Sequence, residues 1–309
     1  MKIYGWTGLL LLIISEWGLF REIEPFDTWF YCFAWWSYIL LADNLLLIFR
    51  GRSLLLGRLR EFRAMIPISI FVWLVFEALN FRLQNWSYSI PTMATWQRWA
   101  GYLISYATVL PGVFITADLV ELFWRKRSSA PFASECNSQS PLRMPRHSLP
   151  WVVFGFCLTI APLIWPRYLF PMVWVGAIFL LNPLLGKFGK QCLSFKIRSG
   201  HGKRVWSLML AGLICGLMWE FWNYWAGSRW IYSVPFFGEW KVFEMPVLGF
   251  LGFPPFALEC WILYHLIQAV LHSMSSRIFR LVWWLGMGII SVLILLGIDA
   301  YTVAMQNGL

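Results

Sequence analysis

The sequence predicts an all-α polytopic membrane protein with about nine transmembrane helices. Of its 309 residues, 59% are hydrophobic and only 13% are charged, against about a quarter charged in soluble domains. Apolar runs of about 20 residues, enough to cross ~30 Å of hydrocarbon, recur along the whole chain. Most Lys and Arg fall in every second loop between these runs, which is typical of a multi-pass topology.

Each predicted helix is an apolar run bounded by charged or turn-forming residues. The first run follows Lys2 and resembles a signal peptide, but Glu16 interrupts it and no small-residue cleavage site follows. We therefore expect a retained first helix. In chain order, the nine expected spans are 3–20, 28–49, 64–81, 100–124, 148–166, 169–186, 205–226, 246–272 and 281–304.

The basic loops predict the orientation. They follow the second, fourth, sixth and eighth spans, so the positive-inside rule places them and the N-terminus in the cytoplasm and the C-terminus outside. This distribution also explains the net charge of +10 without a nucleic-acid partner. We expect an integral plasma-membrane protein, of the inner membrane if the cell is bacterial. The sequence leaves the oligomeric state open.

One motif occurs twice, in the third and seventh spans. A Glu and an Asn three residues later share one face of a Trp-rich helix, and a Trp-x-Tyr segment follows them. The matching residues are Glu77 and Glu220, Asn80 and Asn223, Trp86 and Trp230, and Tyr88 and Tyr232.

This duplication predicts the domain organisation. Four spans separate equivalent positions, so both copies cross the membrane in the same direction as parallel repeats. We expect a first four-helix repeat over 1–127, a second over 148–276 and a C-terminal transmembrane helix over 277–309. The Ser- and Pro-containing segment 128–147 is too polar to fold alone and is interpreted as a cytoplasmic linker.

Four carboxylates interrupt the apolar spans: Glu77, Asp118, Glu220 and Glu259. Each would cost roughly 2.5–3.5 kcal/mol if ionised and isolated at the bilayer centre. They must therefore face one another, face water or be neutral. They could serve as hydrogen-bonding contacts between helices, but their matching positions in both halves favour a functional site. The Gly and Pro residues before Asp118 and Glu259 suit either a binding site or tight packing.

The candidate catalytic residues follow from these positions. Glu220 and Glu259 are predicted as acid and base, with Asn223 orienting them, and Glu77, Asp118 and Asn80 form a second or vestigial set.

The aromatic segment after span seven either anchors the chain at the membrane interface or covers the site. We expect Asp299, near the outer end of the last span, to reach water. No metal or cofactor motif is found. The predicted substrate-binding residues are Trp86, Tyr88, Trp219, Trp230, Tyr232 and Pro255.

Isoprenoid chemistry suits such a pocket. A carboxyl group in dry surroundings can stay protonated and protonate an alkene, and Trp and Tyr faces stabilise the resulting cation by up to ~2 kcal/mol each. An apolar, lipid-like substrate would enter from the membrane. The same duplicated halves and interrupted helices are also typical of a proton-coupled transporter or lipid flippase, which is the alternative.

A family resemblance indicates the same chemistry. Glu220 and Asn223, then Trp230-Ile231-Tyr232, then an acid after Pro255 occur in the order found in the integral-membrane lycopene cyclase domain and related carotenoid-modifying proteins, which this part of the chain resembles. The resemblance implies a cyclase, isomerase or hydratase built from duplicated helical units. The chain departs from that family by a four-span repeat and by a single acid, Glu259, four residues after Pro255, where the family has paired acids.

Overall fold

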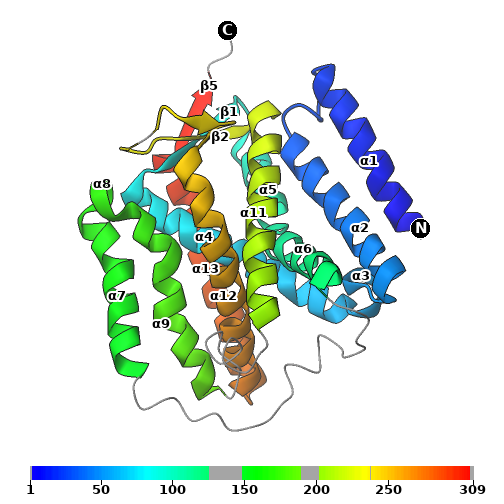
Figure 1. The fold of residues 1–309 in the computed structure, drawn as a ribbon. Helices are drawn as coiled ribbons and strands as arrows, with labels where there is room; N and C mark the ends of the chain where they lie inside the picture. Colours follow the sequence, from blue (N-terminus) through cyan, green and yellow to red (C-terminus); the bar gives the residue numbers. More distant parts are fainter. Residues whose placement is uncertain (1, 125–147, 189–201, 237, 307–309) are drawn as a thin grey trace.

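The computed structural model describes residues 2–124, 148–188, 202–236 and 238–306, and the predicted linker 128–147 lies outside them. The described chain is mostly helical (Figure 1). Its helices are α1 (Ile3–Phe20), α2 (Phe30–Arg50), α3 (Leu54–Gly57), α4 (Leu59–Leu83), α5 (Thr95–Tyr106), α6 (Val109–Trp124), α7 (Ser148–Ile164), α8 (Pro166–Leu169), α9 (Val173–Lys187), α11 (Gly202–Trp225), α12 (Phe253–Ser273) and α13 (Arg277–Tyr301).

Within the described ranges, eight helical stretches are long and apolar enough to cross a membrane, counting α5 with α6 and α8 with α9 as one stretch each. This confirms a multi-pass, mostly helical membrane protein. The predicted span 148–166 corresponds to α7, whose 17 residues leave it shorter than the other eight. The predicted span 246–272 begins as a 3-10 helix, η3 (Val247–Gly252), before α12 continues it.

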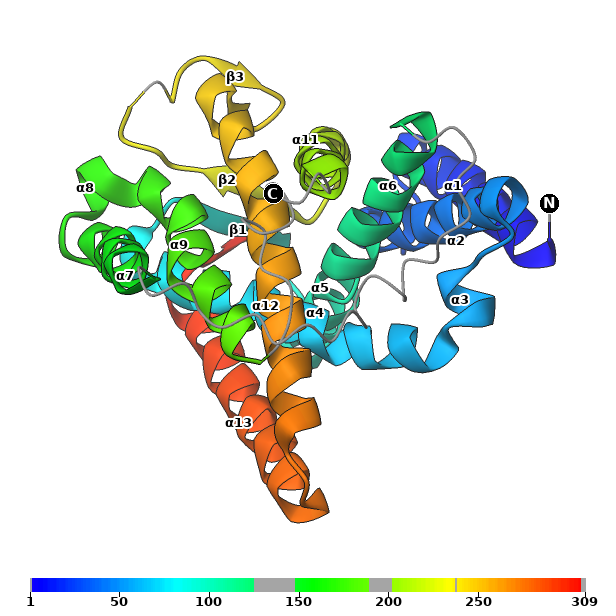
Figure 2. The ribbon, with the colours of Figure 1, turned by 60° about the horizontal axis from the view of Figure 1, so that its bottom comes forward.

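The helices form two hairpins around a central group. α1 packs against α2, α7 packs against α9, and the two hairpins lie on opposite flanks of the molecule (Figure 2). Between them, α6 packs against both α2 and α11, and α12 packs against both α9 and α11. α13 packs against α4. The core between these helices is rich in aromatic side chains: the ring of Trp35 contacts that of Trp219, Trp219 contacts Trp73, and Trp73 contacts Phe256.

Close helix contact depends on two glycines of α11. A Cβ atom added at Gly212 would lie 2.3 Å from the carbonyl oxygen of Phe253, and one at Gly216 would lie 2.2 Å from its ring. Only glycine lets α11 and α12 approach this closely. Pro111 and Pro255, expected inside broken helices, lie in the first turns of α6 and α12, where a missing N–H costs nothing.

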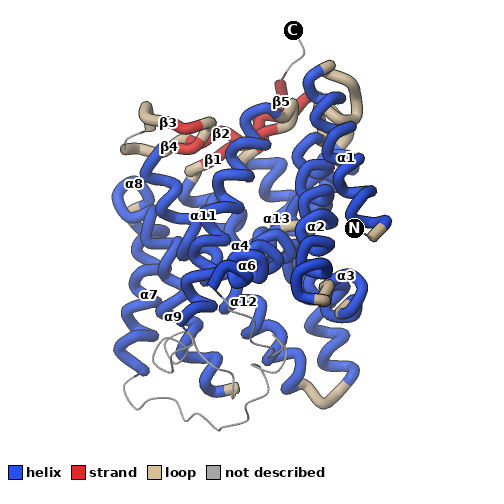
Figure 3. Tube along the Cα trace, turned by 45° about the vertical axis from the view of Figure 1, so that its right-hand side comes forward, coloured by secondary structure: helices blue, strands red, loops and turns tan. Residues whose placement is uncertain are grey.

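The strands, which the sequence did not predict, gather at one end of the helices (Figure 3). β1 (Trp86–Pro91) lies between β2 (Arg229–Tyr232), to which it is antiparallel, and β5 (Val303–Gln306), to which it is parallel. β3 (Lys241–Val242) and β4 (Met245–Pro246) form a separate ribbon. The Trp-x-Tyr spacing explains β1: alternate residues of a strand share one face, and Trp86, Tyr88 and Ile90 are all buried. The two Trp-x-Tyr segments, which form β1 and β2, therefore pair with each other.

Candidate functional site

The two motif copies build the same connection from helix to strand. Near the end of α11, the Asn223 side chain donates from Nδ2 to the Trp230 carbonyl at 2.8 Å and accepts the Trp230 N–H at 2.9 Å. In the first copy, Asn80 donates to the Trp86 carbonyl at 2.8 Å and accepts the N–H groups of Asn85 and Trp86 at 2.8 and 3.3 Å. Each Asn thus satisfies backbone groups that the turn after the helix would otherwise leave unpaired.

The Glu of each motif faces the Tyr of its own strand. In the second copy, Tyr232 Oη donates to Glu220 Oε1 at 2.9 Å, and Trp230 Nε1 donates to Tyr232 Oη at 2.9 Å. Burial and the neighbouring Glu220 raise the pKa of Tyr232 well above its usual value, so the phenol remains a donor. The Glu220 side chain is fully buried, and its Oε2 atom has no hydrogen-bond partner among the described residues.

The Glu of the first copy is held by more donors. Glu77 Oε1 accepts hydrogen bonds from Trp73 Nε1 at 2.8 Å, Trp86 Nε1 at 3.2 Å and Tyr88 Oη at 2.5 Å. Tyr88 Oη also lies 3.1 Å from Tyr106 Oη. Burial raises the pKa of Tyr88 well above its usual value, and Glu77 adds to the effect. In both copies the Glu therefore accepts a hydrogen bond from the Tyr of the following Trp-x-Tyr segment. The other donors around the two Glu side chains differ.

Two cavities meet at the paired strands. The first has a volume of about 110 Å³, and its wall includes Glu220 together with Arg98 and Tyr102 of α5. The second has a volume of about 510 Å³ and lies between the strands, the α8–α9 region and the beginning of α12. They share five wall residues, all aromatic: Trp73, Tyr88, Trp230, Tyr232 and Phe253.

The structure does not bring Glu259 to Glu220. Glu259 is fully buried on α12, and its Oε1 accepts the backbone N–H of Ala177, near the beginning of α9, at 3.1 Å. No hydrogen bond or ion pair joins the two carboxyl groups in the described part of the chain. A carboxyl group near the N-terminal end of a helix stabilises it, so the placement of Glu259 suits a packing role.

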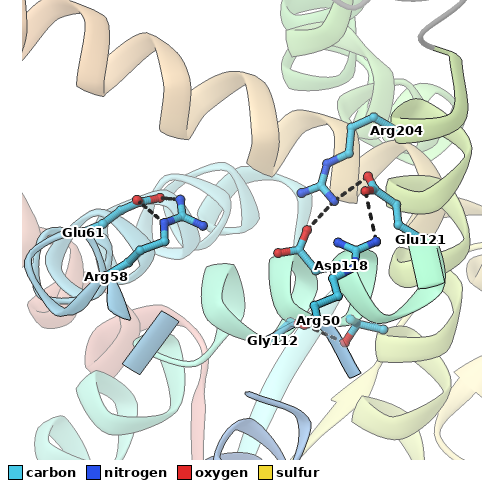
Figure 4. A network of polar contacts seen from close by, with 8 residues as sticks. Arg50, Arg58, Glu61, Gly112, Asp118, Glu121 and Arg204 are labelled. Atoms are coloured by element: carbon cyan, nitrogen blue, oxygen red, sulfur yellow. Dashed lines mark hydrogen bonds and ion pairs between the residues drawn. The ribbon is translucent and has the colours of Figure 1, made fainter. Parts of the chain in front are cut away.

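Asp118 likewise lies apart from Glu77. It is three turns into α6, where it accepts a hydrogen bond from Arg204 Nη1 of α11 at 2.7 Å (Figure 4). The same Nη1 atom lies 3.0 Å from Glu121 Oε1, and Arg50 Nη2 of α2 lies 3.6 Å from Glu121 Oε2. Asp118 therefore belongs to a charged network that joins α2, α6 and α11, because Arg204 is itself almost fully buried and needs a counter-charge.

The predicted substrate-binding residues all lie around the two cavities. Trp219 lines the smaller cavity, Trp86 and Pro255 line the larger one, and Tyr88, Trp230 and Tyr232 line both. Of the predicted catalytic residues, Glu220 lines the smaller cavity. Glu77, Asn80, Asn223 and Glu259 line neither of the two, and Asp118 lines a third cavity near Arg50.

Sequence reasoning missed several residues of this region. Tyr102 and Tyr106 of α5 line the smaller cavity, and their i, i+4 spacing on an amphipathic helix was a usable signal. Arg98 is also in this wall and forms an ion pair with Asp299 of α13 at 3.0 Å. Asp299 also accepts a hydrogen bond from Trp99 Nε1 at 2.8 Å, and its side chain remains 17% exposed, so it is held by α5 without being fully buried.

No protein-family model, curated protein or solved structure matches this chain.

Proposed function

We propose that this chain is a membrane-embedded enzyme that acts on an isoprenoid or other lipid-like substrate by acid–base chemistry, with Glu220 as the group that transfers the proton. The observation that carries the proposal is the position of Glu220. It is a fully buried carboxyl group in the wall of an aromatic cavity, with one oxygen oriented by Tyr232 and the other without a partner among the described residues.

The cavities support a lipid-like substrate. The larger one is lined almost wholly by aromatic and aliphatic side chains, and its volume of about 510 Å³ falls within the range of small-molecule sites. The smaller cavity has room for only a few ligand atoms, but the carboxyl group of Glu220 lies in its wall. We infer that an apolar chain occupies the larger cavity and presents its reacting end to Glu220 across the shared aromatic wall.

The chemistry needs few groups. Glu220 would give a proton to an alkene, and its carboxylate would then take a proton from the carbon next to the resulting cation, while the Trp230–Tyr232–Glu220 chain of hydrogen bonds would keep its carboxyl group oriented. The faces of Trp73, Trp219 and Trp230 would stabilise a developing positive charge. Glu259 has no part in this proposal because its carboxyl group faces α9.

We further propose that the chain is a parallel duplication and that the site faces the outer side of the membrane. The equivalent α1–α2 and α7–α9 hairpins and the equivalent Asn contacts support the duplication. The positive-inside rule supports the orientation, because the sheet lies at the end opposite the turn between α12 and α13, where Arg277 and Arg280 begin α13 (Figure 1).

Glu220→Gln is the decisive variant. A strain that lacks the gene is complemented with the wild type, Glu220→Gln or Glu259→Gln, and its lipid extract is compared by mass spectrometry. We expect the wild type and Glu259→Gln to restore any lipid species lost on deletion, and Glu220→Gln to lower its formation by at least about 100-fold. Restoration by Glu220→Gln would refute the assignment.

The transporter alternative predicts a different result. Cys260 adjoins Glu259 and is fully buried in the structure. A variant that retains only this cysteine should resist a water-soluble thiol reagent from both sides of the membrane. A lipid profile unchanged by deletion, together with labelling of Cys260, would favour a water-filled transport path and replace the enzyme proposal.

A further inference from the structure

A third cavity lies at the opposite end of the molecule from the candidate site. Its volume is about 390 Å³, and Glu61 and Met65 near the beginning of α4 line it. Glu77 and Asn80 lie near the other end of this 25-residue helix, which is roughly 35 Å long. The cavity is therefore distinct from the site around Glu220, and its position is the end that the positive-inside rule assigns to the cytoplasm.

The cavity wall has a basic part and an apolar part. Arg50, Arg52 and Arg58 contribute the cations, against Glu61 and Asp118. Arg58 pairs with Glu61, and Arg204 pairs with Asp118, so these acids are already neutralised (Figure 4). The rest of the wall is largely apolar and includes Leu46, Leu47, Leu54, Met65, Phe114 and Ile115.

Two arginines retain unused binding capacity. Arg50 Nη2 forms an ion pair with Glu121 Oε2 at 3.6 Å, which is too long for a hydrogen bond, so this buried nitrogen has no hydrogen-bond acceptor in the described ranges. Arg52 is exposed and forms no ion pair with any described residue. Because Glu121 compensates the charge of Arg50, the exposed Arg52 supplies the net positive charge of this wall, and Arg50 can add a hydrogen bond to an anionic group.

Hydrogen bonds to Asp43 hold the turn after α2, which carries these arginines. Fully buried Asp43 accepts hydrogen bonds from the Leu54 N–H at 2.6 Å, from Ser53 Oγ at 2.5 Å and from Tyr4 Oη at 3.0 Å. Gly51 ends α2 with a φ of +66°, a left-handed conformation that glycine adopts without strain. The chain therefore turns between Arg50 and Arg52 while both remain in the cavity wall. Because this turn is already ordered, a ligand would not have to order it on binding.

We propose that this cavity binds the phosphate group of an anionic membrane lipid. The guanidinium groups of Arg50 and Arg52 would donate hydrogen bonds to the phosphate oxygens, for which their planar forks are suited. The apolar part of the wall would contact the first carbons of the acyl chains. Basic pockets between transmembrane helices on the cytoplasmic side are known to bind such headgroups. A free phosphate shares the polar chemistry but would leave the apolar wall uncovered.

The test measures lipid binding to the full-length protein in detergent by native mass spectrometry. Phosphatidylglycerol is compared with phosphatidylcholine of the same acyl chains, for the wild type, Arg52→Gln and Arg50→Gln. The matched control is Arg60→Gln, because Arg60 is exposed on α4 and is not in the cavity wall. Thermal unfolding is recorded for each variant, and Arg52→Gln is expected to unfold like the wild type.

We expect the wild type to prefer phosphatidylglycerol, Arg52→Gln and Arg50→Gln each to weaken its binding about fivefold, and Arg60→Gln to change it less than about twofold. Equal loss in Arg52→Gln and Arg60→Gln would overturn the proposal, since it would indicate general attraction to a basic surface. Displacement of the lipid by inorganic phosphate at equal concentration would also overturn it and assign the cavity to a soluble phosphate.

Discussion

Replacing Asn223 by Ala tests the connection that places β2 over the candidate site. The variant removes two hydrogen bonds, to the N–H and to the carbonyl of Trp230. A net contribution of about 1 kcal/mol for each bond, and a further penalty for leaving partly buried backbone groups unpaired, give a loss of roughly 2–4 kcal/mol. By the usual scaling for large domains, this corresponds to a fall of roughly 5–10 °C in the unfolding midpoint.

The assay is thermal unfolding of the purified protein in detergent, followed by intrinsic tryptophan fluorescence, which the chain's 22 Trp make sensitive. Tyr224→Phe is the matched control, because this neighbouring side chain is exposed and its replacement removes one hydroxyl. Asn223→Asp should destabilise at least as much as Asn223→Ala, since it would bury a carboxyl group and place one of its oxygens against the Trp230 carbonyl oxygen. An Asn223→Ala midpoint equal to that of the control would refute the reasoning.

Three further predictions concern packing, charge and the site. Gly212→Ala should destabilise by about 1–3 kcal/mol because its Cβ would clash with α12, whereas Gly286→Ala, with nothing within 4 Å of its Cβ, should be neutral or stabilising in the same unfolding assay. Arg204→Met should lower the free energy of unfolding by about 3–5 kcal/mol, because it leaves the carboxylate of Asp118 without its counter-charge. Adding Asp118→Leu should recover part of this loss, and no recovery would contradict the pairing. Tyr232→Phe removes the donor to Glu220, so it should lower product formation about tenfold or more while the unfolding midpoint changes by a few degrees; full activity would exclude a role for this bond.

The helices could be predicted because their signal is local. A run of about 20 apolar residues needs no knowledge of its neighbours, and α4, α11 and α13 occur where hydropathy placed them. The aromatic face of β1 was also present in the sequence as Trp86-x-Tyr88-x-Ile90. The sequence alone does not predict a strand there, because a strand is stable only when it finds a partner, and that partner, β2, is far away in the chain.

The charged contacts could not be predicted for the same physical reason. Arg98 pairs with Asp299 and Arg204 pairs with Asp118, across separations that no helical periodicity reveals. Intramembrane charge predicts that a partner exists, but it does not say which one. Asp118 therefore looked like the counterpart of Glu259, although the structure gives the two residues unrelated surroundings.

The difference between the two motif copies is itself an argument about function. Three donors converge on one oxygen of Glu77, and its other oxygen, like that of Glu220, has no hydrogen-bond partner among the described residues, but Glu77 lines neither of the two cavities. Glu220 is bonded through one oxygen to Tyr232 and lies in a cavity wall, so the same carboxyl group there is free to meet a ligand. Equivalent backbone contacts by Asn80 and Asn223 hold both copies in place. In the proposed enzyme, the first copy would therefore serve as the fixed half of the strand pair, while the second would supply the reactive group, and a single site at the junction would need both.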